Sequence, residues 1–138
     1  MMSTTTHTMK YTFTAWGHPN ITGTHKNTIE FTKDSEIGIE ADCIIGVKAD
    51  FNRERLMHFI REQELGEHTP IRLCIEAGEE HESLYFTCNI LFDDNKELVI
   101  RTTNFCSKRT LGVQATKSAK YLSRAFVSRL CHPEQQIV

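Results

Sequence analysis

Hydrophobic and polar residues alternate along two stretches near the start of the chain, residues 10–16 and residues 24–33. Alternation with a period of two is typical of β-strands that bury one face. The connection between them, residues 17–23, holds two glycines, a proline and an asparagine, which favour a turn. The pattern therefore predicts that the two strands form a β-hairpin with its turn at this connection.

A third apolar segment, residues 43–49, carries two isoleucines and a valine on both of its faces, which is typical of a strand inside a sheet. Residues 51–63 follow with apolar side chains three and four positions apart, a spacing that predicts an amphipathic helix. We expect Asp50 to be the N-cap of this helix, because its carboxylate can accept a hydrogen bond from a free amide of the first turn.

The remainder of the chain carries the same kinds of signal. Apolar runs and alternation predict four further strands, and apolar positions spaced by three and four predict a second helix with Thr116 as its N-cap. We also expect a short strand at the end of the chain. The strands cover residues 71–77, 83–90, 98–104 and 110–115, the helix extends to about residue 131, and the last strand covers residues 135–138.

Two short segments 66 residues apart share a pattern: Gly46–Asp50 reads Gly-Val-Lys-Ala-Asp, and Gly112–Thr116 reads Gly-Val-Gln-Ala-Thr. Each precedes a predicted helix and then a strand, and similarity at a fixed offset is the mark of an internal repeat. We therefore predict a duplicated strand–strand–strand–helix–strand unit, at about residues 9–77 and 82–138. The expected fold is α+β, a mixed sheet or partly closed barrel with two helices.

Composition narrows the class of protein. The chain of 138 residues fits one domain, with residues 1–8 expected to be a flexible tail. Its formal net charge of -2 does not favour a general nucleic-acid-binding protein. The 5 cysteines include no Cys-x-x-Cys pair, which favours reduced thiols in the cytoplasm over a disulfide framework. No apolar run approaches the ~18 residues of a membrane-spanning helix.

Several motifs of the first half, together with the later Gly112-Val113-x-Ala115, resemble one archaeal family, catalogued as domain of unknown function three-seventy-one. The resemblance spans nearly the whole chain. It implies an archaeal cytosolic protein and brings no activity with it. The motifs are Gly17-His18-Pro19-Asn20, His25, Thr28-x-Glu30-x-Thr32 and Asp42-Cys43-Ile44-x-Gly46-Val47-x-Ala49-Asp50.

The two histidines beside the first predicted turn, His18 and His25, are the first candidates for chemistry. A hairpin would bring them close enough to hold a divalent metal ion, with Asp42 or Cys43 as a third ligand. Either imidazole could also act as a general base near neutral pH. The alternative is structural, with His18 holding the turn and His25 packing at the edge of the core.

Glu30 shares a strand face with Thr28 and Thr32, so its carboxylate could orient a ligand hydroxyl or a water molecule. The alternative is a solvated strand face. Cys43 could be a nucleophile if a nearby imidazole lowered its pKa. Free cysteine is otherwise a small buried hydrophobic residue.

The predicted helix starts at Asp50 and Thr116 suggest anion sites, because free amides there attract a phosphate or carboxylate. Lys108 and Arg109 precede the second of these starts and would add positive charge. The alternative is two ordinary capped helices. The second helix also carries basic residues that could bind nucleic acid or simply be solvated: Lys117, Lys120, Arg124 and Arg129.

These candidates favour a protein that binds, or acts on, a small anionic metabolite at the first hairpin loop. The site would consist of His18, Asn20, His25, Glu30 and Asp42, with Thr28 as a further ligand contact. The sequence leaves open whether catalysis occurs and whether a metal takes part. Two alternatives remain, a nucleic-acid-associated module and a structural protein that forms homodimers.

Overall fold

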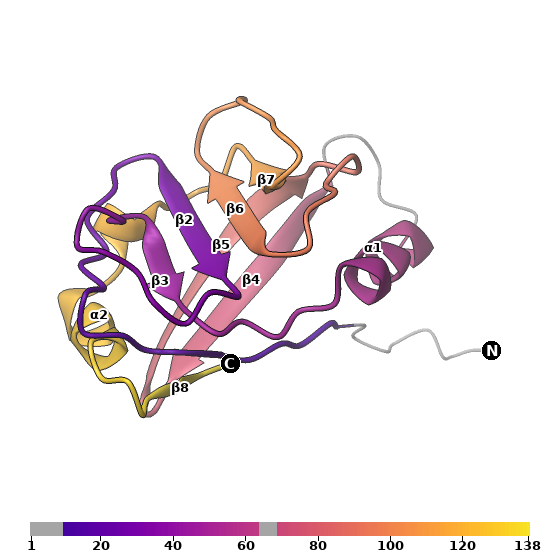
Figure 1. The fold of residues 1–138 in the computed structure, drawn as a ribbon. Helices are drawn as coiled ribbons and strands as arrows, with labels where there is room; N and C mark the ends of the chain where they lie inside the picture. The colour runs from indigo at the N-terminus through magenta and orange to yellow at the C-terminus, as the bar shows by residue number, and fades with distance from the viewer. Residues whose placement is uncertain (1–9, 64–68) are drawn as a thin grey trace.

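The computed structural model describes residues 10–63 and 69–138; the predicted tail at residues 1–8 lies outside them. These residues form one eight-stranded sheet and two α-helices (Figure 1). The helices are α1 (Arg53–Glu62) and α2 (Arg124–Leu130), and a 3-10 helix at Ala119–Tyr121 precedes α2. The strands are β1 (Ala15–Trp16), β2 (Thr28–Thr32), β3 (Ile44–Gly46), β4 (Pro70–Ala77), β5 (Glu80–Cys88), β6 (Glu97–Arg101), β7 (Thr110–Val113) and β8 (Gln136–Ile137).

The strand order is β1-β8-β4-β5-β7-β6-β2-β3, so β1 and β3 stand at its two ends. Trp16 and Val47 join these ends, each amide donating to the other's carbonyl at 2.8 Å. The sheet is thereby a nearly closed barrel. The pairs β2–β3 and β6–β7 are parallel, and the other strand pairs are antiparallel. The predicted α+β fold, a mixed sheet curled into a barrel with two helices, is confirmed.

The predicted hairpin is wrong, because β1 and β2 are not neighbours. β1 pairs with β8, whereas β2 lies between β3 and β6. Residues 17–23 are therefore a connection between separated strands, and the amide of Gly17 donates to the carbonyl of Gln135. β3, predicted inside the sheet, stands at one end of the strand order. Alternation specifies which face of a strand is buried, but it does not identify the neighbouring strand.

Both predicted helix caps are also wrong. The Asp50 carboxylate accepts a hydrogen bond from the amide of Thr14 at 2.7 Å, and the Thr116 hydroxyl accepts one from the amide of Tyr85 at 3.0 Å. The side chains of Asn52 and Ser123 cap α1 and α2 instead. Neither Asp50 nor Thr116 thus caps a helix, and α1 and α2 begin at Arg53 and Arg124 instead.

The two halves of the chain do share unusual backbone contacts. Lys48 and Gln114, 66 residues apart, both have a positive φ, 53° and 54°. Each is followed by an alanine whose amide donates to the neighbouring parallel strand, Ala49 to Thr32 of β2 and Ala115 to Arg101 of β6. These matching contacts support the predicted duplication, which stays a prediction.

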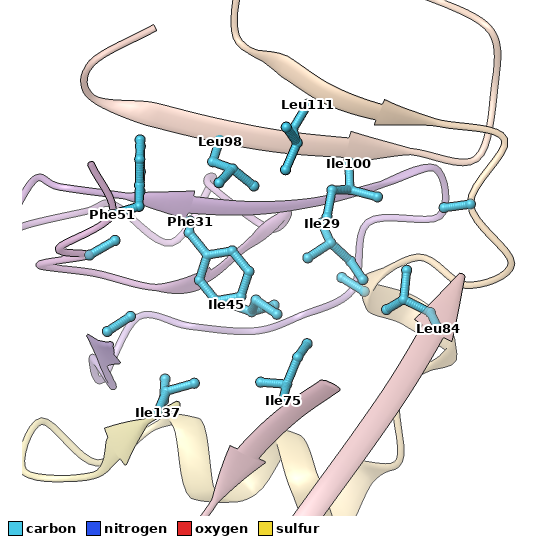
Figure 2. Packing of buried hydrophobic residues seen from close by; sticks show 14 of the residues in the cluster. Ile29, Phe31, Ile45, Phe51, Ile75, Leu84, Leu98, Ile100, Leu111 and Ile137 are labelled. Atoms are coloured by element: carbon cyan, nitrogen blue, oxygen red, sulfur yellow. The ribbon is translucent and has the colours of Figure 1, made fainter. Parts of the chain in front are cut away.

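The core lies inside the barrel. Ile29 and Phe31 from β2 face Ile75 of β4 and Ile137 of β8 across it, and none of the four is more than 2% exposed (Figure 2). The side chains that alternate with them on β2 point away from the core. One strand therefore supplies both the barrel interior and a second, polar layer outside the sheet.

Gly112 provides a test of the close packing. A Cβ at this position would overlap the ring of Phe86. We expect Gly112→Ala to lower the free energy of unfolding by about 1–3 kcal/mol, the range for overpacked cores. Urea unfolding followed by circular dichroism measures this. The control is Gly38→Ala, whose Cβ would have the exposed, flexible carboxylate of Glu40 as its nearest neighbour; equal effects of the two changes would contradict the packing argument.

Candidate functional site

His18 and Asn20 hold the residue 17–23 connection in place. His18 is 8% exposed, its Nδ1 accepts from the amide of Asn20 at 3.0 Å, and its Nε2 lies 3.2 Å from the Glu36 carboxylate. The Asn20 side chain donates to the carbonyl of Ile37 at 2.8 Å. Both side chains therefore tie this connection to the segment that leads into β3.

His25 organises the start of β2. Its Nδ1 accepts from the amides of Asn27 and Thr28, both at 3.1 Å, and lies 2.9 Å from the Thr28 hydroxyl. The ring nitrogen that faces the protein is thus engaged by local donors. Within residues 10–63 and 69–138, no three His, Cys, Asp or Glu side chains are grouped so that they could hold a metal ion.

The parallel pairing of β2 with β3 brings Asp42 to the same end of the sheet as His25. The Asp42 carbonyl accepts from the amides of Thr24 and His25 at 3.1 and 3.2 Å. Only parallel pairing could place the residue before β3 beside the start of β2. The contact is made by backbone atoms, so it fixes the strand register and does not involve the Asp42 carboxylate or the His25 imidazole.

The principal cluster of ionisable groups surrounds Glu30, which is 4% exposed on the outer face of β2. The Cys43 thiol donates to its carboxylate at 3.5 Å, and the Arg109 guanidinium lies 3.9 Å away. Arg109 also donates to Glu97 at 2.7 Å. We call Glu30, Cys43, Glu97 and Arg109 the Glu30 cluster.

Burial and the neighbouring Glu97 charge raise the pKa of Glu30 to about 7, although Arg109 opposes the rise. A carboxyl group with such a pKa exchanges its proton near neutral pH. Burial and the Glu30 charge also raise the pKa of the Cys43 thiol, to about 11. A cysteine nucleophile needs a lowered pKa, so this environment does not favour the thiolate.

Arg109 was expected to add positive charge ahead of the second helix, and in the structure it lies against two carboxylates of the Glu30 cluster. Lys108 is exposed, and its carbonyl accepts from the amide of Asp93 at 2.8 Å. Sequence reasoning missed Glu97 altogether. The only sequence signal of Glu97 is its place directly before the predicted strand that became β6. Its partner on the neighbouring strand, Thr32, is known only from the pairing of β2 with β6.

Two of the basic residues near α2, Lys117 and Arg124, form hydrogen bonds or ion pairs within the fold. The Arg124 guanidinium donates to backbone carbonyls that include those of Gly23 at 3.1 Å and Ala119 at 3.0 Å. Lys117 pairs with Glu82 at 2.8 Å. These bonds connect the segment before α2 to the rest of the fold, which favours a structural role for these two residues over nucleic-acid binding.

An apolar cavity of about 590 Å³ extends from the barrel interior to α1. We call it the barrel cavity. Its apolar walls come mainly from residues 10–13, α1, β4 and β6, and Lys10 and Arg72 are among its few charged lining residues. It lies inside the usual range for ligand pockets, roughly 300–1,000 Å³. The apolar lining includes Tyr11, Phe13, Phe31, Leu56, Phe59, Ile60, Ile71, Leu73, Ile75, Phe86, Leu98, Ile100, Leu111, Ile137 and Val138.

These features define a small α+β barrel protein with an apolar cavity beside α1 and a buried carboxyl cluster outside the sheet. A family model described as Domain of unknown function (DUF371) matches residues 13–138, and the chain belongs to that family. The uncharacterized protein MJ0206 of the archaeon Methanocaldococcus jannaschii is 32% identical over 130 residues, covering 88% of this chain and 91% of that protein. Neither description names an activity.

Among the described residues, no helix combines the length and the apolar character needed to cross a membrane.

Glu30 predicts a particular dependence of stability on pH. Its folded pKa of about 7 lies above the ordinary value of 4.5, so the folded state holds the proton more tightly. The contribution of Glu30 to stability is therefore greatest below pH 4.5 and declines as the pH rises through 7. We expect Glu30→Gln to remove this decline, which is on the order of 2–3 kcal/mol.

Urea unfolding at pH 5 and pH 8 measures the effect as the change in unfolding free energy between the two conditions. The matched control is Glu134→Gln on the exposed surface, which should leave the pH dependence of the parent protein intact. A Glu30→Gln protein with the same pH dependence as the parent would show that Glu30 is ionised normally.

Proposed function

We propose that this protein binds a small organic anion whose apolar body occupies the barrel cavity. The observation that carries the proposal is the cavity itself, with apolar walls and the cations Lys10 and Arg72 in its lining. An apolar pocket with a few convergent polar groups is the default place for a ligand in a small domain. The proposal keeps the ligand class expected from the sequence and moves its site from residues 17–23 to the barrel.

The shape of β4 supports an entrance at its start. Along its inner face Ile75 is 1% exposed, whereas Ile71 and Leu73 are only half-buried. Apolar side chains that remain half-exposed inside a barrel gain stability when a ligand covers them. Phe59 of α1 is likewise half-buried and lines the same cavity.

The two cations favour a negatively charged ligand. Lys10 and Arg72 are both exposed, and neither forms an ion pair with another described residue. Glu76 also lines the cavity, farther along β4. A ligand carboxylate or phosphate near Arg72 would gain a charge-assisted hydrogen bond.

The proposal is one of binding, and it assigns no catalytic residue. His18, His25, Glu30, Asp42 and Cys43 do not line the barrel cavity. We also expect the protein to work in a reducing compartment such as the cytoplasm, since all five cysteines are free thiols.

Decanoate and decanol test the site and its charge preference. Decanoate should raise the melting temperature by several degrees when present in large excess over its Kd, because it binds only the folded protein. Decanol should raise it less, since it lacks the charge. Ile71→Trp should abolish both effects by filling the cavity, and Arg72→Gln should remove the advantage of decanoate.

Differential scanning fluorimetry measures these shifts. The control for the tryptophan change is Ile39→Trp, at a position that is 69% exposed and outside the cavity lining. Undiminished decanoate stabilisation in Ile71→Trp would mean that the ligand binds elsewhere.

A further inference from the structure

We propose that Arg101 and the loop between β6 and β7 bind a tetrahedral oxyanion, a phosphate or sulfate group, on the outside of the barrel. We call Arg101 and this loop, residues 102–109, the Arg101 site. In Figure 1 the loop projects from the end of the barrel at which β6 stops. The inference goes beyond the proposed function, because none of these residues lines the barrel cavity.

Arg101 is the last residue of β6 and lies on the outer face of the sheet. Leu98 and Ile100 point into the barrel (Figure 2), so Val99 and Arg101, which alternate with them, point outward. Thr110 of β7 is the partner of Val99 in the parallel pair. The Arg101 site therefore lies on the same polar face of the sheet as the Glu30 cluster.

Two contacts hold the guanidinium of Arg101 in one orientation. Its Nε donates to the hydroxyl of Thr110 at 2.9 Å, and its Cζ lies 4.8 Å from the centre of the Phe105 ring. The same hydroxyl accepts a hydrogen bond from the amide of Ser107 at 3.1 Å, so the loop itself fixes this oxygen. A guanidinium that is already oriented loses less conformational freedom when it binds a ligand.

The terminal nitrogens of Arg101 are left as donors without an acceptor. Within residues 10–63 and 69–138, no group accepts a hydrogen bond from them or forms an ion pair with Arg101. A guanidinium has five N–H donors in one plane, and here only the one on Nε is used. The open edge matches two oxygens of a phosphate or sulfate group.

Arg101 also lacks a compensating charge at neutral pH. Partial burial and the neighbouring charge of Arg109 lower the pKa of Arg101, whereas Glu30, Cys43 and Cys106 would raise it if they were ionised. The Cys43 thiol, with a pKa of about 11, keeps its proton, and Glu30, with a pKa of about 7, holds one below neutrality. A bound oxyanion would offset the repulsion between the two guanidinium groups.

The first half of the chain shows that the backbone does not require an arginine here. The pairs β2–β3 and β6–β7 have the same register, with an irregularity after Glu30 in one and after Val99 in the other. In this register Thr32 corresponds to Arg101, and each carbonyl accepts from an alanine amide. Thr32 is fully buried, and its hydroxyl accepts from the amide of Asp34. The second half thus replaces a locally satisfied side chain with open donors.

Phe105 extends the Arg101 site beyond a single charge. Its side chain is 63% exposed, although one face of the ring contacts the guanidinium. Most of the ring therefore remains free to pack against an apolar or aromatic group attached to the anion. Free phosphate and a phosphate ester share the chemistry that Arg101 recognises, and Phe105 distinguishes them.

Sodium sulfate is the first probe, because its charge is constant between pH 5 and pH 8. In the full chain, sulfate should cause saturable NMR shifts of the Arg101 Nε–Hε signal and of the amides of residues 102–109. Sodium chloride at the same ionic strength is the reference. Arg101→Gln should abolish the shifts, and Arg101→Lys should weaken binding several-fold, because lysine lacks the planar fork.

The matched control for these variants is Arg55→Gln on α1. Arg55 is exposed, and its guanidinium likewise has no hydrogen-bond or ion-pair partner among the described residues. This change should leave sulfate binding at the Arg101 site intact. Ile71→Trp should also leave it intact, since that change alters the barrel cavity, so the result separates this inference from the proposed function.

Glu30 provides a test that leaves Arg101 unchanged. Glu30 faces Cys43, Glu97 and Arg109 of its cluster and is close enough to influence the charge of Arg101. Sulfate should bind several-fold more tightly at pH 5 than at pH 8, because Glu30 acquires a negative charge as the pH rises through 7. Glu30→Gln should remove most of this difference.

Methyl phosphate and phenyl phosphate distinguish the two sources of the anion. Tighter binding of phenyl phosphate that Phe105→Ala removes would support an aromatic ester as the ligand, and equal binding of the two would support free phosphate. Shifts that sodium chloride reproduces, that persist in Arg101→Gln or that disappear equally in Arg55→Gln would overturn the proposal. The same holds for a protein whose Arg101 signal does not respond to sulfate at either pH.

Discussion

The ladder between β2 and β6 is the interaction on which the other parts of the fold depend. Five residue pairs, from Thr28 with Arg101 to Thr32 with Glu97, join strands from the two halves of the chain. Inward, Ile29 and Leu98 contribute to the barrel core; outward, Glu30 becomes the centre of a polar cluster. β2 then pairs in parallel with β3, and β6 pairs in parallel with β7. The remaining strands, β5, β4, β8 and β1, continue the sheet from β7.

Local pattern predicted the elements well and their neighbours poorly. The alternation around Ile29 and Phe31 identified a strand, and the spacing around Leu56 and Ile60 identified α1, because burial of one face leaves a periodic signal. The hairpin failed because period-two patterns are compatible with many partners. The caps at Asp50 and Thr116 failed for a related reason. Their side chains accept hydrogen bonds from the amides of Thr14 and Tyr85, which lie 36 and 31 positions away in sequence, and a rule based on neighbouring residues cannot predict such contacts.

The candidate site residues show the same limit: local pattern places a residue on a strand, but it does not identify the neighbours that distant strands contribute. Glu30 and Cys43 were identified from composition and position, and they do lie together, since parallel pairing joins β2 to β3. Glu97 was missed because it enters the cluster from a strand nearly 70 residues away. The barrel cavity was missed as well. A cavity is space left between elements, and its size depends on how far α1 and β4 stand from residues 10–13, which no single segment encodes.

The β2–β6 ladder also has a consequence for how the chain acquires its structure. Thr28 and Arg101 are neighbours in space and more than 70 positions apart in sequence, and Ala15 of β1 pairs with Ile137 of β8, the last strand. Non-local pairing of this kind slows folding, because loop closure costs entropy before the contacts form. During synthesis, the first half emerges before β6, the strand that pairs with β2. Because β1 pairs with β8, the barrel is completed only after the last strand has left the ribosome.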